Sequence, residues 1–297
     1  MKTRTAALAA ILAAALYALN APLSKLLLAD VPPSMMAALL YLGAGAGMLL
    51  TGLVRSSLQR GKADSTPAVR LFSREMVPYT LGMIVLDIAA PILLMTGIDL
   101  TSAESASLLN NFEIVATSLI ALLLFREHIS RRLWAAIGLI VVASTLLTIQ
   151  SGAELSLSAG SILVLLASTS WGLENNCTRR LSVADPLRVV VVKGLGSGCG
   201  ALLVAFLSGE SLPGVVYIPA ALLLGYVAYG LSIFFYVYAQ RHLGAAKTSA
   251  FYAIAPFIGV ALSLAIFRDV PSLFFLIALV VMIAATVLVV RDQKDAE

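Results

Sequence analysis

Long apolar runs joined by short polar connections occupy this sequence almost from end to end. A helix needs about 20 mostly apolar residues to cross the hydrocarbon core of a bilayer. Ten runs meet that length: 5–28, 34–54, 76–98, 102–125, 131–150, 158–180, 186–208, 215–239, 244–267 and 271–290. The sequence therefore predicts an all-α integral membrane protein with ten transmembrane helices.

The charge content agrees with a membrane protein and decides its orientation. Only 12% of the residues are charged, whereas a soluble domain carries about 25%. With the N-terminus in the cytoplasm, 17 Lys and Arg residues flank the spans on the cytoplasmic side and Arg268 alone lies opposite. Cytoplasmic flanks of membrane proteins carry an excess of such residues. Both termini are therefore predicted to be cytoplasmic, and the basic residues indicate a lipid bilayer as partner, with no nucleic acid.

The two halves of the chain share a pattern of positions. Three positions of the first span recur 154 residues later: Tyr17, Asn20 and Ser24 correspond to Trp171, Glu174 and Thr178. The fourth and ninth spans also end alike, in LLLFRE (122–127) and LAIFRD (264–269). Because five spans per copy is an odd number, the second copy must enter the membrane in the opposite orientation. We therefore predict two inverted five-helix repeats, 1–150 and 151–297, around a central cavity.

Polar residues form a stripe within the fourth span. Asn110, Glu113 and Thr117 share one face of a helix that is otherwise apolar. A charged side chain at mid-bilayer costs roughly 2.5 kcal/mol or more. Glu113 is tolerated there if it meets water, meets a partner or takes a proton, which predicts that this face borders the cavity.

Polar and aromatic residues of other spans extend the predicted substrate pathway. The candidates are Tyr17, Asn20, Asp87, Asn110, Glu113, Trp171, Glu174, Asn175, Tyr229 and Tyr252. The asparagines have an alternative role, because amides often join membrane helices by hydrogen bonds worth about 0.6 kcal/mol. Glu174 has a second alternative, as a capping or interfacial carboxylate.

Prolines and glycines within the spans are candidates for hinges and close packing. They are Pro22, Pro91, Pro256, Gly43, Gly47, Gly194 and Gly198. Proline removes a helical hydrogen bond, and small residues spaced four apart let two helices approach closely. No metal cluster, cofactor motif, ATP-binding loop or hydrolase motif is found in the sequence, so neither an enzyme nor a cofactor or metal site is predicted.

The order of these motifs resembles a known family over essentially the whole chain. The motifs are YALN (17–20) and WGLE (171–174), followed by NNFEIVATSLIALLLFREHIS (110–130) and AIAPFIGVALSLAIFRDVPS (253–272). They resemble the drug/metabolite transporter superfamily of EamA type, specifically bacterial ten-helix metabolite exporters such as the aromatic amino-acid exporters. The resemblance implies a location in the bacterial inner membrane and a cavity lined by spans 1, 3, 4, 6, 8 and 9, with spans 5 and 10 peripheral. Ile114 departs from the family, which often has proline there, and this weakens a symmetrical hinge.

These observations predict a secondary transporter that exports small metabolites by alternating access, with amino acids bearing aromatic or other apolar side chains as the first candidates. Glu113 or Asp87 is expected to bind the substrate ammonium or to exchange a proton. A drug or nucleotide-sugar carrier is the first alternative, although phosphate groups call for a cavity Lys or Arg and only Lys25 and Lys193 lie within spans. An intramembrane enzyme acting on lipid-linked substrates ranks lower. The oligomeric state is left open, and a monomer is compatible with the sequence.

Overall fold

A computed structural model of the chain describes residues 2–58, 71–100, 109–110, 112–150, 159–255, 257–259, 261–262 and 273–294. Every regular element within these ranges is a helix. In the first half the helices are α1 (Lys2–Tyr17), α2 (Asn20–Leu27), α3 (Pro33–Leu58), α4 (Val77–Leu100), α6 (Phe112–Leu123) and α7 (Arg131–Gln150). In the second half they are α8 (Ala159–Leu181), α9 (Pro186–Leu207), α10 (Tyr217–Leu224), the π-helix η1 (Gly225–Leu231), α11 (Ser232–Leu243), α12 (Ala245–Tyr252) and α14 (Leu273–Lys294).

A described helix overlaps each of the ten predicted ranges. Within the described ranges, five helical stretches are long and apolar enough to cross a membrane: Arg4–Leu27, Pro33–Ser57, Val77–Leu100, Pro186–Leu207 and Tyr217–Leu243. Two shorter apolar helices are Phe112–Leu123 and Leu276–Leu288. These findings confirm an all-helical chain with several membrane-spanning helices. The number ten and the inverted repeat stay predictions.

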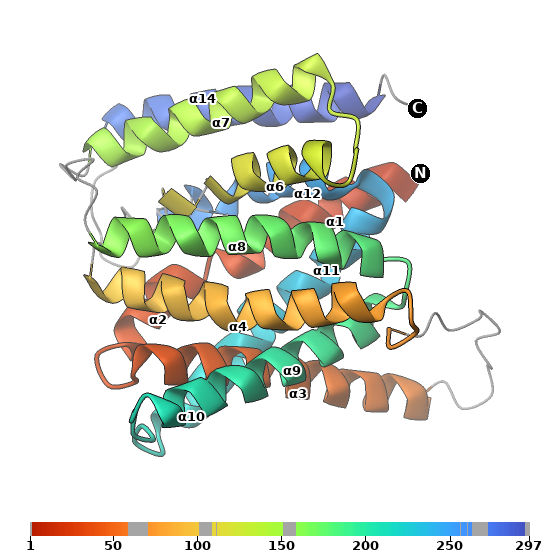
Figure 1. Cartoon of the computed structure of the whole chain (residues 1–297). Coiled ribbons are helices and arrows are strands. Elements are labelled where there is room, and N and C mark those ends of the chain that lie inside the picture. Colours follow the sequence, from red (N-terminus) through yellow and green to blue (C-terminus); the bar gives the residue numbers. More distant parts are fainter. Residues whose placement is uncertain are drawn as a thin grey trace.

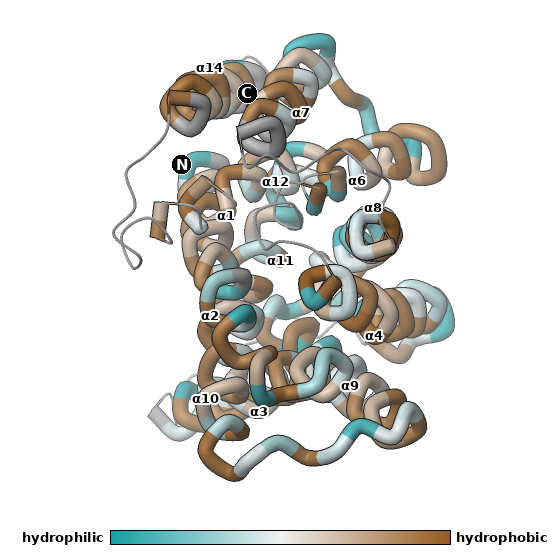
Figure 2. The backbone as a smooth tube through the Cα atoms, turned by 90° about the vertical axis from the view of Figure 1, so that its left-hand side faces the viewer, coloured by the Kyte–Doolittle hydropathy of each residue, from teal (hydrophilic) through white to brown (hydrophobic). Residues whose placement is uncertain are grey.

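The helices run roughly parallel to one another in a bundle. α7 and α14 pack against each other at one edge, and α3, α9 and α10 form the opposite edge (Figures 1 and 2). Seen along the helices, α1 and α2 lie on one flank, α4 and α8 lie on the other, and α11 and α12 lie between them (Figure 2). α1 begins and α14 ends at the same end of the bundle, where the α6–α7 and α8–α9 connections also lie (Figure 1).

Two predicted spans are interrupted near the middle. The first divides into α1 and α2 at Ala18 and Leu19, because Pro22 has no N–H to bond the carbonyl of Ala18. The eighth contains the π-helical turn Gly225–Leu231 between α10 and α11. Such turns are often found at functional sites, and this one carries Tyr229 toward the centre of the bundle.

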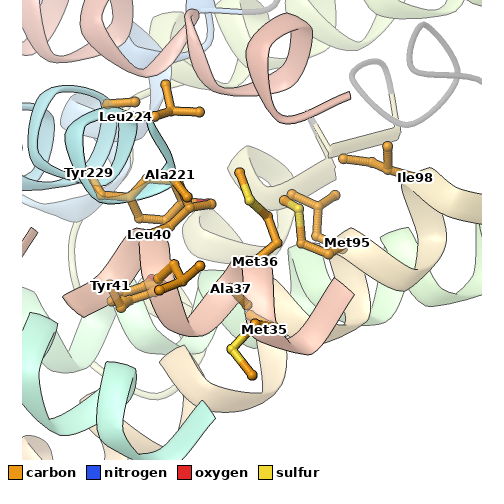
Figure 3. Close-up of a cluster of buried hydrophobic side chains, with 14 of the residues drawn as sticks. Met35, Met36, Ala37, Leu40, Tyr41, Met95, Ile98, Ala221, Leu224 and Tyr229 are labelled. Carbon is orange, nitrogen blue, oxygen red and sulfur yellow. The ribbon is translucent and has the colours of Figure 1, made fainter. Parts of the chain in front are cut away.

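Glycines bring three helices into backbone contact. A Cβ atom on Gly194 of α9 would lie 2.6 Å from the Cα of Gly45 and 2.8 Å from the carbonyl oxygen of Tyr41, both in α3. Gly43 lies equally close to the backbone of Leu222 in α10. The same region holds a buried apolar cluster in which α3 residues face Leu224 and Tyr229 (Figure 3). The glycines therefore place α3 directly between α9 and α10.

Each half of the chain caps a helix of the other half with a carboxylate. Glu210, after α9, accepts hydrogen bonds from the backbone N–H groups of Ser34 (3.1 Å) and Met35 (2.7 Å) at the start of α3. Glu127, after α6, accepts one from the N–H of Ala245 (3.3 Å) at the start of α12. Carboxylates satisfy unpaired N–H groups and favour the positive end of the helix dipole. The caps tie the halves together at both ends of the bundle.

Glu127 gives the stability of the protein a specific pH dependence. Burial raises the pKa of its carboxyl above the ordinary 4.5, although the positive charge of Arg179 and the N–H of Ala245 oppose the rise. The folded state therefore binds this proton more tightly than the unfolded state does, and the group's contribution to stability is lost as the pH rises through the folded-state pKa. Glu127→Gln keeps an acceptor for Ala245 and removes the titration. In thermal melts in detergent, the melting temperature of the variant is expected to rise relative to that of the wild type as the pH is raised above the ordinary carboxyl pKa of 4.5.

The matched control for this prediction is Glu75→Gln, which removes an exposed carboxylate. The melting temperature of that variant is expected to follow the wild type at every pH. A difference in melting temperature between Glu127→Gln and the wild type that stays constant across the pH range would contradict the prediction. It would show that Glu127 has the same pKa in the folded and unfolded states.

Candidate functional site

A central cavity is lined by residues from seven of the predicted spans. The lining residues are Tyr17, Tyr41, Glu113, Trp171, Glu174, Asn175, Lys193, Tyr229, Ile233, Tyr236 and Tyr252. About 50 Å³ is open to the centres of water-sized molecules, enough for a few waters, since one water needs about 10–15 Å³. The cavity therefore has to widen before it holds a metabolite.

Lys193 of α9 lies between two carboxylates from other helices. Its Nζ atom is 3.2 Å from Oδ2 of Asp87 in α4 and 3.0 Å from Oε1 of Glu174 in α8. All three side chains are buried. Tyr41 of α3 donates a hydrogen bond of 2.8 Å to Oδ1 of Asp87, and Thr178 donates one to Glu174. Four helices thus meet in one ionic cluster, Asp87–Lys193–Glu174.

Glu113 of α6 is a third carboxylate and lies outside that cluster. Its Oε1 accepts a hydrogen bond of 2.7 Å from Nδ2 of Asn175, which also donates to the hydroxyl of Thr117 at 3.2 Å. Unlike Asp87 and Glu174, Glu113 is only partly buried. It is therefore the carboxylate best placed to meet a molecule in the cavity.

Aromatic rings from five helices, α1, α3, η1, α11 and α12, form a continuous wall of the cavity. The ring centroid of Tyr17 lies 5.7 Å from that of Tyr229 and 5.3 Å from that of Tyr252. Tyr41 continues the series at 5.0 Å from Tyr229, and Tyr236 does so at 5.0 Å from Tyr252. Several of these pairs meet edge to face, which is a favoured geometry. The wall gives the cavity an apolar, polarisable surface beside its charges.

Seven of the ten predicted pathway residues line the cavity: Tyr17, Glu113, Trp171, Glu174, Asn175, Tyr229 and Tyr252. The other three, Asn20, Asp87 and Asn110, are not among the lining residues and contact other helices instead. Asn20 is buried and donates to the hydroxyl of Tyr229 at 3.3 Å. Asp87 is held by Lys193 and Tyr41, and the Oδ1 of Asn110 accepts a 3.3 Å bond from Ser168 of α8. Asn20 and Asn110 thus make hydrogen bonds between helices, which was the alternative role considered for the asparagines in the sequence.

The predicted hinge and packing residues lie at close helix contacts or bends. Gly43, Gly47, Gly194 and Gly198 all pack against neighbouring helices. Pro22 follows the break between α1 and α2, and Pro91 is buried within α4. Pro256 lies outside the described residues.

Tyr41, Lys193, Ile233 and Tyr236 also line the cavity, although sequence reasoning did not place them in the pathway. For Lys193 a signal was present, because a lysine inside a membrane span is rare and usually faces the protein interior. Tyr41 carried no such signal. The family resemblance implied no cavity residues from spans 2 and 7, yet the glycine contacts between α3 and α9 bring both helices to the cavity.

The site is built from carboxylates, one ammonium group, amides and rings. Within the described ranges, no group of three His, Cys, Asp or Glu residues has the arrangement of a metal site. The chemistry available is therefore hydrogen bonding, ion pairing and stacking, which suits binding and release of a small molecule.

Comparison with known proteins agrees with this chemistry. The profile of the EamA-like transporter family matches residues 4–149 and 158–291. The chain belongs to the EamA-like transporter family. A protein described as an uncharacterized transporter from Methanothermobacter thermautotrophicus is 24% identical over 290 residues, which cover 94% of this chain and 84% of that protein. A solved structure described as "Crystal structure of protein" superimposes with a TM-score of 0.77 at 18% identity, over 95% of this chain and 94% of that one.

Membership of the EamA-like family confirms the resemblance seen in the sequence and makes this chain a membrane transporter. The likeness to the solved structure concerns the fold alone. For an EamA-like transporter, a central cavity that joins charged and aromatic side chains is the natural place for the transported molecule.

Proposed function

We propose that this EamA-like protein is a secondary transporter that exports small metabolites across the bacterial inner membrane by alternating access. Its substrates carry an ammonium group on an apolar or aromatic body, and amino acids with such side chains fit that description. The observation that carries the proposal is Glu113, a partly exposed carboxylate that shares one small cavity with the tyrosine wall. Glu113 binds the ammonium, and the rings receive the body of the substrate.

Alternating access follows from two antiparallel copies of one unit, residues 1–150 and 151–297. The family profile matches in two segments, 4–149 and 158–291, and the chain starts and ends at the same end of the bundle (Figure 1). Both observations support an even number of spans with the two termini on the same side of the membrane, and the distribution of Lys and Arg favours the cytoplasmic side. Rocking of one copy against the other would open the cavity to each side in turn.

Two other functions find less support in the geometry. A nucleotide-sugar or other phosphate carrier needs a cation free to bind the phosphate, and Lys193 is already paired with two carboxylates. An intramembrane enzyme would use Glu174 with Arg179 and Arg180 near a membrane face. Glu174 instead points to Lys193, while Arg180 lies 5.6 Å above the ring of Phe125.

The test is counterflow in liposomes that contain the purified protein. Amino acids, amines and nucleotide sugars are each tried with and without a pH gradient. Glu113→Gln is expected to reduce the initial rate for ammonium substrates by about tenfold or more, because it removes a charge-assisted hydrogen bond. If Glu113 also exchanges the coupling proton, the remaining transport loses its dependence on the gradient.

Glu75→Gln serves as the control for charge at an exposed position and is expected to transport at the wild-type rate. Asp87→Asn, alone and combined with Glu113→Gln, separates the two candidate proton sites. If both single variants and the double variant keep wild-type transport and pH dependence, neither carboxylate binds the ammonium or carries the proton.

A further inference from the structure

The charges around the cavity narrow the class of substrate beyond the proposed function. We propose that the cavity selects amines, organic cations with an ammonium group and an aromatic or apolar body, over amino acids that carry the same body and a carboxylate. This inference rests on the proposed transport function and concerns the same cavity.

The first argument is that the cavity's cation is already engaged. Of the residues described along the cavity wall, Lys193 is the only one with a positive charge. Its ammonium group lies within 3.2 Å of both Asp87 and Glu174. A substrate carboxylate that reached Lys193 would displace one of these two, and the displaced carboxylate would remain buried without a partner. Separating a buried ion pair in this way is strongly unfavourable.

The second argument is the sum of charges. Asp87 and Glu174 flank the ammonium of Lys193, and Glu113 is a third carboxylate in the lining of the same cavity. In their ionised forms the cluster and Glu113 carry an excess of negative charge, and the group that donates to Glu113 across the cavity is the neutral amide of Asn175. A monocation offsets this excess, whereas a zwitterion carries a negative charge with its positive one and leaves the excess unchanged.

The third argument is that three of the five tyrosines in the cavity lining use their hydroxyls within the protein. Tyr41 donates to Asp87, and the hydroxyls of Tyr236 and Tyr252 pair with Ser249 (2.8 Å) and Ser232 (3.2 Å). These hydroxyls are therefore poorly available to hold a substrate carboxylate. The ring faces remain, and an ammonium group close to several aromatic faces is attracted to them electrostatically.

The experiment compares compounds that share one body. Wild-type protein in liposomes is tested for counterflow of labelled 2-phenylethylamine, L-phenylalanine and L-phenylalanine methyl ester, in which the carboxylate is blocked. The amine and the ester are expected to exchange about tenfold faster than the amino acid or more, because only they avoid a buried unpaired carboxylate. An equal or faster rate for phenylalanine would overturn the inference.

The other outcomes separate this inference from the proposed function. If none of the three compounds exchanges while another member of the screening panel does, the amine assignment is wrong and transport stands. If no compound in the panel exchanges, both are overturned.

A variant tests the role of Lys193 directly. Asp87→Asn combined with Glu174→Gln releases the ammonium of Lys193, and the ratio of phenylalanine rate to phenylethylamine rate is expected to rise by about tenfold. Size-exclusion profiles and melting curves in detergent establish whether the double variant is folded. The comparison of phenylalanine with its methyl ester uses wild-type protein, so it tests the inference even if the double variant does not fold. An unchanged ratio in a folded variant would show that Lys193 does not exclude carboxylates.

Discussion

Gly194→Val is expected to abolish the folded protein, because α9 then cannot approach α3. Even the first carbon of a side chain at this position would lie 2.6 Å from the Cα of Gly45 and 2.8 Å from the carbonyl oxygen of Tyr41. Both are backbone atoms, so no rotamer change relieves the clash. Overpacking in a well-packed core typically costs about 1–3 kcal/mol. Here the whole helix has to shift, so we expect a cost at or above the upper end of that range.

The matched control is Gly138→Val on α7. Gly138 is exposed, and a Cβ atom placed there would meet nothing within 4 Å. Replacing an exposed helical glycine is neutral or slightly favourable by helix propensity. The measurements are the yield of monodisperse protein in detergent and its melting temperature. A Gly194→Val protein that purifies and melts like Gly138→Val would show that α3 and α9 are not in backbone contact.

The backbone contact between α3 and α9 also determines the positions of two residues in the cavity lining. α3 carries Tyr41 and α9 carries Lys193, and both side chains line the cavity where the two backbones are close. Gly194→Ala adds only the Cβ atom, which already meets the α3 backbone, and the resulting shift of α9 is expected to impair transport even in protein that still folds. The glycines are structural, but the position of the charged cluster depends on them.

The helices and much of the cavity wall followed from patterns within single segments. Apolar runs of bilayer length marked the positions of the helices, because every backbone polar group must be satisfied within the membrane. The stripe that contains Glu113 was visible because a helix repeats every 3.6 residues. Such local periodicities need no knowledge of neighbouring helices.

Features that depend on a neighbouring helix could not be predicted from patterns within single segments. Asn20 and Glu174 occupy matching positions in the two halves, yet Asn20 bonds to Tyr229 and Glu174 pairs with Lys193. The difference lies in what each faces, and a single sequence does not state it. The π-helical turn Gly225–Leu231 is likewise hidden, because π-turns have no strong residue preference comparable to that of proline for a kink.

Lys193→Met is expected to be severely destabilising, although methionine is apolar and close to lysine in size. The substitution leaves Asp87 and Glu174 facing each other in a buried position without their common counter-ion. Breaking a buried ion pair by removing one partner typically costs about 3–5 kcal/mol. We therefore expect a large fall in the yield of folded protein and in its melting temperature.

Neutralising all three groups together is expected to reverse that loss. In the triple variant Lys193→Met, Asp87→Asn and Glu174→Gln, no charge remains in the cluster, and replacing a buried ionic group as a whole is often neutral or stabilising. Melting curves of the single and triple variants provide the comparison. If the triple variant is as unstable as Lys193→Met, the instability of Lys193→Met does not come from the lost ion pairs of the Asp87–Lys193–Glu174 cluster. The other outcome is a triple variant that regains stability and still exchanges amines near the wild-type rate, which depends on Glu113. In that case the binding energy comes from Glu113 and the tyrosine wall, and the cluster acts as a charge filter around Glu113.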